Sequence, residues 1–342
     1  MRKGERQVAN TLKKVRRDHI ERYNLVLKSI KSTDIVLDIA CGIGYGSYLI
    51  AKQAKAFKVT GIDKSASAIR TGKKFYNSKN ILYLKSDIFE VEKIIKEKFF
   101  DVIVTIETLE HLKHDKAYLK LLHKLLKLNG TLFISTPNED VMPYDKKSFP
   151  FHERHYSTQE FVALLNSLGF FITQAFSQVD YHVLNGFGGW INIAVCRKQD
   201  KKMRKQQPDR FKKTYSSLLK EASQRKLEKD FIRLESDRLF KLGRDKEFWF
   251  LNKKWLKFEK AHPLYLRGFF WERRGIDRYA IRYFRRASLL KVDAKNKAFI
   301  VSSLFHLAQL YKRRDLKIKA LKKCLRLAPN HQGAKKLLKS LI

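Results

Sequence analysis

Apolar runs alternate with amphipathic segments in the first part of this 342-residue chain. Runs with the length and β-branched content of buried strands cover residues 36–39, 59–63, 81–88, 99–106 and 129–138. Segments with helical periodicity lie between them, at 46–53, 67–76 and 115–128. A helix at 158–168 and two last strands at 170–176 and 191–197 follow. This alternation predicts an α/β fold with a doubly wound, seven-stranded, Rossmann-like sheet.

The first predicted strand leads into a loop with three glycines at alternate positions, Gly42, Gly44 and Gly46. Glycine permits positive φ and lets a ligand approach the backbone closely. A dinucleotide-binding loop has the spacing G-x-G-x-x-G, whereas the third glycine here comes one residue early and Ser47 takes its place. The spacing therefore favours another nucleotide-like ligand.

An acidic residue lies at or near the end of each of the first three predicted strands: Asp38, Asp63 and Asp87. Ligands of doubly wound sheets bind beyond the carboxyl ends of the strands, so we expect these acids around one site. Asp63 follows the glycine loop by about 20 residues, where an acid bonds the ribose hydroxyls in nucleotide-binding folds. The alternative for Asp63 and Asp87 is that each caps a turn or a helix.

These motifs resemble the class I S-adenosylmethionine (SAM) methyltransferases, over residues from about 15 to 197. The resemblance is to ubiquinone-biosynthesis O-methyltransferases, and still more to methyltransferases found with bacterial surface-polysaccharide synthesis. The matching segments are 19–23, the glycine loop with Ser47, 61–63, 107–111, 135–138 and 151–152.

The resemblance implies SAM as cofactor and assigns residues to its parts. The glycine loop and Asp38 would contact the methionine moiety, Asp63 the ribose diol, and Asp87 with Ile88 the adenine. A helix expected at 8–28 would close the pocket. His19, Arg22 and Tyr23 share one face of that helix.

Glu107, Glu110 and His111 follow the fourth strand, where the acceptor pocket should open. The resembling ubiquinone O-methyltransferases use the same E-x-x-E-H pattern for Mg²⁺, so these three residues are candidate metal ligands. A metal would lower the pKa of a bound substrate hydroxyl. In the alternative interpretation Glu107 lines the SAM pocket, and Glu110 and His111 begin a helix.

An oxygen acceptor needs a base, for which histidine suits neutral pH. His111, His152 and His155 are candidates, and we predict His152 as the base, with Glu110 and His111 beside it. The loop 149–156 is either an acceptor lid or a polar loop whose side chains satisfy backbone groups.

Charge is spread unevenly along the chain, whose formal net charge is +39. Residues 1–200 carry a net +11 and residues 201–342 a net +28. This break predicts three parts: a methyltransferase domain at 1–198, a basic linker at 199–213 and a basic all-α region at 214–342. Tetratricopeptide-like hairpins are expected from about residue 261, on the pattern of the following small and aromatic residues: Gly268, Trp271, Gly275, Ala280, Phe284 and Ala287.

Aromatic residues interleave with Lys and Arg in the second half, as in 248–250 and 269–271. They suit an anionic membrane interface, single-stranded nucleic acid or a protein partner, or else they form a helical core. No run is long enough for a membrane span, and three cysteines without pairing spacing suit a reducing compartment. We therefore expect a cytoplasmic protein, peripheral at the inner membrane face if the basic half binds there.

Three functions are thus open. The first is methylation of a hydroxyl on a small molecule or saccharide. The second is methylation of nucleic acid, although no N-P-P-Y motif for amino-group methylation of bases is present. The third is a SAM-binding scaffold without catalysis, against which the intact glycine loop and Glu110-His111 argue.

Overall fold

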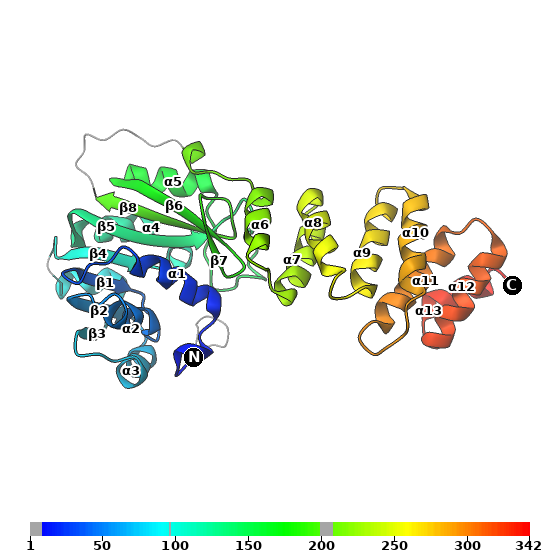
Figure 1. Ribbon diagram of the computed structural model, residues 1–342, viewed down its shortest axis with the longest axis horizontal. Helices are drawn as coiled ribbons and strands as arrows, with labels where there is room; N and C mark the ends of the chain where they lie inside the picture. Colours follow the sequence, from blue (N-terminus) through cyan, green and yellow to red (C-terminus); the bar gives the residue numbers. More distant parts are fainter. Residues whose placement is uncertain (1–8, 96, 199–207) are drawn as a thin grey trace. The chain divides into compact units, whose positions relative to one another are not determined.

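The computed structural model describes residues 9–95, 97–198 and 208–342, and their contacts divide the chain into two units (Figure 1). The first unit ends at Lys226 and the second begins at Leu227. This division falls after helix α6, later in the sequence than the linker expected at 199–213. Residues 199–207 of that linker lie outside the described part, and the segment after them pairs with the sheet unit. There Phe187 donates from its backbone nitrogen to the carbonyl of Phe211, and Lys213 donates to the carbonyl of Phe187.

The first unit is built on one mixed sheet of eight strands among its described residues. The strands are β1 (Ile35–Ile39), β2 (Lys58–Asp63), β3 (Ile81–Lys85), β4 (Phe100–Thr105), β5 (Leu126–Pro137), β6 (Phe170–Val179), β7 (His182–Asn185) and β8 (Ile191–Lys198). Their spatial order is β3-β2-β1-β4-β5-β8-β6-β7. The first five are parallel, and β8, β6 and β7 join antiparallel.

The predicted Rossmann-like sheet is confirmed, with one strand more than the seven expected. The additional strand, β7, pairs with the end of β6 through residues 176–179 and 182–185. This strand has only four residues, and so short a segment shows no recognisable period of apolar and polar residues. Strand order reverses between β1 and β4, and this is the crevice where ligands of such sheets bind.

Helices cover both faces of the sheet. They are α1 (Arg17–Leu27), α2 (Tyr45–Lys52), α3 (Ala66–Phe75), α4 (Asp115–Leu125), α5 (Thr158–Ser167) and α6 (Tyr215–Gln224). Side chains of β1 alternate between two cores: Leu37 packs with residues of α4 and α5, whereas Val36 packs with residues of α1 and α2. Helix α5 begins with the expected capping box, formed by Ser157 and Glu160.

The first helix is shorter than the sequence predicted. Only Leu12–Lys14, a 3-10 turn, and α1 are helical in the described part of 8–28. Val15 breaks the helix because it is extended and buried in the core with Tyr23 and Val26. The hydroxyl of Tyr76 also donates to the carbonyl of Ala9, which ties the preceding segment to the sheet unit.

The second unit is all-α in its described residues, as expected. It contains α7 (Lys229–Lys241), α8 (Asp245–Trp255), α9 (Ala261–Glu272), α10 (Asp277–Ser288), α11 (Lys297–Leu310), α12 (Arg314–Leu327) and α13 (Gln332–Lys339). Helix α7 packs on α8, and from α9 to α13 each helix packs on the next. The ring of Phe284 fills the space beside Gly268. Their membership of the tetratricopeptide class stays a prediction.

Some of the aromatic residues of this unit lie in its interior. Phe248, Trp255 and Phe284 are buried, and Phe258 is half exposed. The core interpretation therefore holds for these three rings, which are not available to stack on bases or enter a bilayer. Among the described residues, no helix combines the length and apolarity that crossing a bilayer requires.

Candidate active site

The glycine loop between β1 and α2 forms an open backbone cradle. Gly42 and Gly44 have φ of 56° and 82°, and a Cβ on Gly42 would meet no atom within 4 Å. The backbone nitrogen of Gly42 donates to Asp63 Oδ2 over 2.9 Å, which holds the loop to the end of β2. A backbone in this conformation with free space beside it fits close approach of a nucleotide-like ligand.

Asp38 is buried at the end of β1 and holds two neighbouring elements. Tyr23 of α1 donates to one carboxylate oxygen over 3.0 Å, and Ser47 of α2 donates to the other over 2.6 Å. Burial raises the pKa of Asp38 to about 6, although both hydrogen bonds act in the opposite direction. The sequence-predicted Asp38 and Tyr23 thus meet directly, through a contact that spacing did not reveal.

Arg22 is buried beside this pair on α1. Its Nη1 donates to Gln178 Oε1 over 2.5 Å, and its Nη2 lies 3.7 Å from Asp18. Its Nε is buried and has no hydrogen-bond partner among the described residues. An unsatisfied buried guanidinium donor is costly. This free Nε–H group could donate to a ligand carboxylate, such as that of the methionine moiety of SAM. Arg22 and the glycine loop would then both contact that moiety.

Asp63 and Asp87 both have structural partners. Besides Gly42, Asp63 accepts from the backbone nitrogen of Ser65 over 2.8 Å. Asp87 is exposed and caps the following 3-10 turn by accepting from Phe89. Asp87 therefore acts as a cap, as the alternative interpretation expected. The roles of Asp63, Asp87 and Ile88 toward ribose and adenine stay predictions.

Glu107 is held at the end of β4 by Ser135 of β5. Its backbone nitrogen donates to Ser135 Oγ, and Ser135 Oγ donates to Glu107 Oε1, each over 3.0 Å. Glu107 has a φ of 50°, a left-handed conformation that is uncommon for a non-glycine residue. Such strain clusters at functional sites, so the position fits the pocket-lining interpretation of Glu107.

Glu110, His111 and His152 come together beyond Glu107. One carboxylate oxygen and one nitrogen of each imidazole lie within 4.8 Å of one another. Glu110 is buried, and its Oε1 has no hydrogen-bond partner among the described residues. Burial, and then the negative charge of Glu107, raise the pKa of Glu110 well above its ordinary value. The three predicted catalytic residues thus form one cluster.

The metal set predicted from sequence differs from this cluster. The structure brings His152, not Glu107, to Glu110 and His111, because Ser135 holds the Glu107 carboxylate. Mg²⁺ prefers oxygen ligands in an octahedral arrangement, whereas two of these three donors are imidazole nitrogens. The donor set therefore does not fit Mg²⁺.

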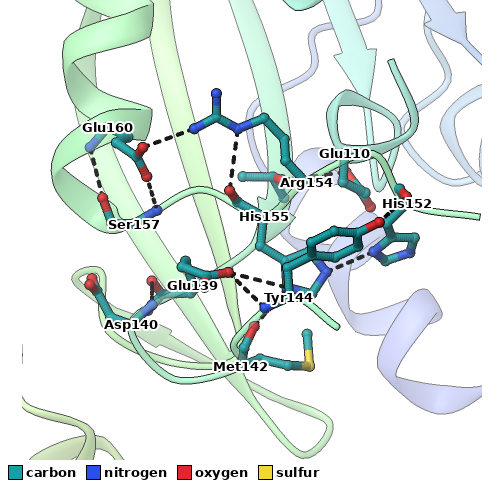
Figure 2. Close-up of polar contacts among 12 residues, drawn as sticks. Glu110, Glu139, Asp140, Met142, Tyr144, His152, Arg154, His155, Ser157 and Glu160 are labelled. Carbon is teal, nitrogen blue, oxygen red and sulfur yellow. Dashed lines mark hydrogen bonds and ion pairs between the residues drawn. The ribbon is translucent and has the colours of Figure 1, made fainter. Parts of the chain in front are cut away.

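The segment 139–156 brings His152 to the cluster and is itself tied down (Figure 2). Glu153 donates from its backbone nitrogen to the carbonyl of Glu110 over 2.7 Å, and Nδ1 of His111 bonds the carbonyl of Phe151 over 2.9 Å. His152 Nδ1 lies 2.8 Å from His155 Nε2. Burial lowers the pKa of His152 to about 3, with further lowering by His111 and His155, so this imidazole is neutral near pH 7.

Several residues of the site were missed by sequence reasoning. Ser47 and Ser135 hold the Asp38 and Glu107 carboxylates, and Gln178 holds Arg22 from the distant strand β6. Ser135 was marked only as part of a strand-ending motif. Its role follows from the parallel register of β4 and β5, in which Thr105 pairs with Ile134.

Comparison with known proteins agrees with this arrangement. Residues 30–212, more than half of the chain, match a family model described as a methyltransferase domain. The chain belongs to this methyltransferase family. The domain is of the class I SAM-dependent type, so SAM is the cofactor that it takes.

Two relatives are ubiquinone biosynthesis O-methyltransferases. The one from Pelagibacter ubique is 36% identical over 118 residues, which are 34% of this chain and 46% of the relative. The one from Rickettsia akari is 35% identical over 111 residues, 32% of this chain and 42% of the relative. The chain thus spans about half the length of these relatives or less. A SAM-dependent methyltransferase structure from Mesorhizobium loti is similar at a TM-score of 0.45 and 14% identity, covering 53% of this chain and 97% of that one.

Proposed function

We propose that this methyltransferase acts on a hydroxyl oxygen of a small-molecule or saccharide acceptor, with His152 as the base. Bound SAM supplies the methyl group and its own leaving group, so the protein has to place the acceptor and accept its proton. The observation that carries the proposal is the convergence of Glu110, His111 and His152 beyond the cofactor crevice.

The cluster has the dimensions of a hydroxyl site. Three atoms within 4.8 Å of one another lie at most about 2.8 Å from a point between them, within the length of a hydrogen bond to oxygen. A protonated Glu110, which its raised pKa favours, can donate to the acceptor oxygen. The neutral His152 can accept the hydroxyl proton while the oxygen takes up the methyl group, although its lowered pKa makes it a weak base before the acceptor binds.

The residues around the cluster support a polar acceptor. Tyr144 and Lys146 both donate to the carbonyl of His152, over 2.8 and 3.0 Å. Glu139 and Arg154 lie on the same segment (Figure 2). Hydroxyl-rich molecules suit such a set of donors and acceptors. The names of the relatives, which specify O-methyltransferases, support oxygen as the methylated atom.

The test is transfer of radioactive methyl from SAM to a panel of phenols, monosaccharides and sugar nucleotides. We expect at least one hydroxyl acceptor to be methylated, and His152→Ala to lose turnover while it still binds S-adenosylhomocysteine in calorimetry. His114→Ala is the matched control, because His114 lies three residues from His111 and outside the cluster. Normal turnover of His152→Ala would remove His152 as base, and methylation of nucleic acid alone would replace the hydroxyl acceptor.

We propose further that the second unit binds an anionic membrane surface by charge. Residues 276–342 contain 18 Lys and Arg against 3 Asp and Glu. The arginines of α10 at 278, 282, 285 and 286 are all exposed. Each cation near an anionic leaflet contributes about 1 kcal/mol. Such binding would bring the enzyme to a lipid-linked saccharide acceptor.

Sedimentation with phosphatidylcholine vesicles, with and without phosphatidylserine, tests this role. We expect binding that requires the anionic lipid and weakens with salt. It should be reduced when Arg282, Arg285 and Arg286 are replaced by Glu, and preserved when they are replaced by Lys. Equal binding to neutral vesicles, or a preference for single-stranded RNA over anionic vesicles, would contradict it.

A further inference from the structure

We propose that His155 is a positioning residue that fixes the ring-nitrogen protonation of His152, so that the lone pair of His152 lies on Nε2. This inference rests on the proposed function, in which His152 accepts the proton of the acceptor. It adds that a hydrogen-bond chain of His152, His155 and the carbonyl of Met142 sets the base before an acceptor binds (Figure 2).

The direction of the chain follows from its last member. His155 Nδ1 lies 2.6 Å from the carbonyl oxygen of Met142, and a carbonyl only accepts, so this nitrogen carries a hydrogen. Neutral His155 then has its lone pair on Nε2. That nitrogen lies 2.8 Å from His152 Nδ1, which must donate the hydrogen of this contact. His152 is left with an unprotonated Nε2, as a base requires.

The surroundings keep His155 neutral and in place. Burial lowers the pKa of His155 below its ordinary value, against the smaller opposing effects of its bond to Met142 and of Glu139. The Glu139 carboxylate lies 3.9 Å from His155 Nδ1. The rings of Phe149 and Tyr144 pack against the imidazole, with centroids 4.6 and 5.5 Å away. A doubly protonated His155 would reverse the chain, and this setting disfavours it.

His111 has the same arrangement through a different carbonyl. Its Nδ1 lies 2.9 Å from the oxygen of Phe151 and therefore carries a hydrogen when the ring is neutral. When both rings are neutral, the two imidazoles of the cluster have their lone pairs on Nε2, and one backbone segment fixes both. Only His152 depends on another side chain for this.

Two substitutions separate positioning from packing. Nδ1 of histidine is bonded to Cγ, as is the amide nitrogen of Asn. Nε2 of histidine is separated from Cγ by one further atom, as is the amide nitrogen of Gln. His155→Gln keeps an acceptor for His152 Nδ1, and His155→Asn keeps a donor for Met142. We therefore expect Gln to preserve most of kcat. Asn and Ala should reduce kcat about 10- to 100-fold, the effect that losing an orienting partner has on a metal-bound imidazole, with KM and the affinity for S-adenosylhomocysteine unchanged.

The results expected for a structural role are opposite. Preserved kcat in the Asn variant with loss in the Gln variant would mean that His155 only anchors Met142, and wild-type kcat in all three variants would also overturn the proposal. In a His152→Ala background we expect His155→Ala to cost nothing further. Wild-type turnover of His152→Ala alone would instead refute the proposed base, which distinguishes that failure from a failure of positioning. Thermal unfolding of each variant checks that it folds.

Discussion

The ring of Tyr23 occupies the space in which a side chain on Gly46 would lie. A Cβ built on Gly46 would be 2.0 Å from Cζ of Tyr23. Because the same Tyr23 donates to Asp38, helix α1 is fixed against both the glycine loop and the end of β1. The third glycine of the loop is thus required by packing, and the first is favoured by its positive φ.

Gly46→Ala should therefore destabilise the protein and weaken cofactor binding together. The added methyl cannot fit without displacing Tyr23, and overpacking of this kind costs about 1–3 kcal/mol. We expect a lower midpoint in urea and a higher Kd for S-adenosylhomocysteine. The double variant Gly46→Ala/Tyr23→Ala should lose less stability than the sum of the losses in the two single variants. An additive double variant would show that the two residues do not compete for this space.

Asp38 gives the site a pH dependence with a defined sign. Its folded-state pKa is raised from 3.8 to about 6, so the folded protein binds this proton more tightly than the unfolded chain. The contribution of Asp38 to stability is therefore greatest below the unfolded value and is lost as pH rises through about 6. Each whole number by which the folded and unfolded pKa values differ corresponds to about 1.4 kcal/mol of stability.

Urea denaturation of wild type and Asp38→Asn from about pH 4 to about pH 7 measures this contribution. We expect the wild type to lose stability relative to Asp38→Asn as the pH rises over this range, because only the wild type has a carboxyl group at position 38 that loses its proton. Parallel curves for the two proteins would mean that Asp38 titrates normally. The Asn side chain keeps the volume of Asp38, so packing is matched.

The fold was largely predictable because it depends on local periodicity. Apolar runs marked the five parallel strands, and Ser157 with Glu160 marked the start of α5. The extent of α1 was not predictable, because Val15 is extended to satisfy a core formed by distant residues. Strand β7 was missed because its pairing with β6, not its own sequence, defines it.

The site was predictable in its residue types and less so in its pairings. The glycine loop, Arg22 and the cluster histidines stand in recognisable motifs. His152, and not Glu107, lies beside Glu110, because the segment 139–156 carries His152 there and Ser135 binds the Glu107 carboxylate. Neither feature is encoded at short sequence range, so the candidate set taken from residues 107–111 and the cluster in the structure differ in their third member.

Removal of divalent cations should leave methyl transfer intact. The cluster offers two imidazole nitrogens and a carboxylate with a raised pKa, which suit a hydroxyl better than Mg²⁺. We expect equal turnover before and after dialysis against EDTA, and no stimulation by added Mg²⁺. Loss of activity that this ion restores would show that the cluster is a metal site after all.

Arg22 should recognise the carboxylate of the cofactor through its unsatisfied Nε. Arg22→Gln removes that donor from a buried position, and hydrogen bonds to charged groups contribute about 1.5–3 kcal/mol, so we expect a Kd for S-adenosylhomocysteine about 10- to 100-fold higher. Methylthioadenosine lacks the amino-acid moiety, so its Kd should be unchanged in the same variant. The control is Arg16→Gln, because Arg16 is exposed and, among the residues that the structure describes, pairs with Asp18 at the start of α1. Equal weakening of both ligands by Arg22→Gln would mean that Arg22 shapes the whole pocket through Gln178 and does not bind the carboxylate.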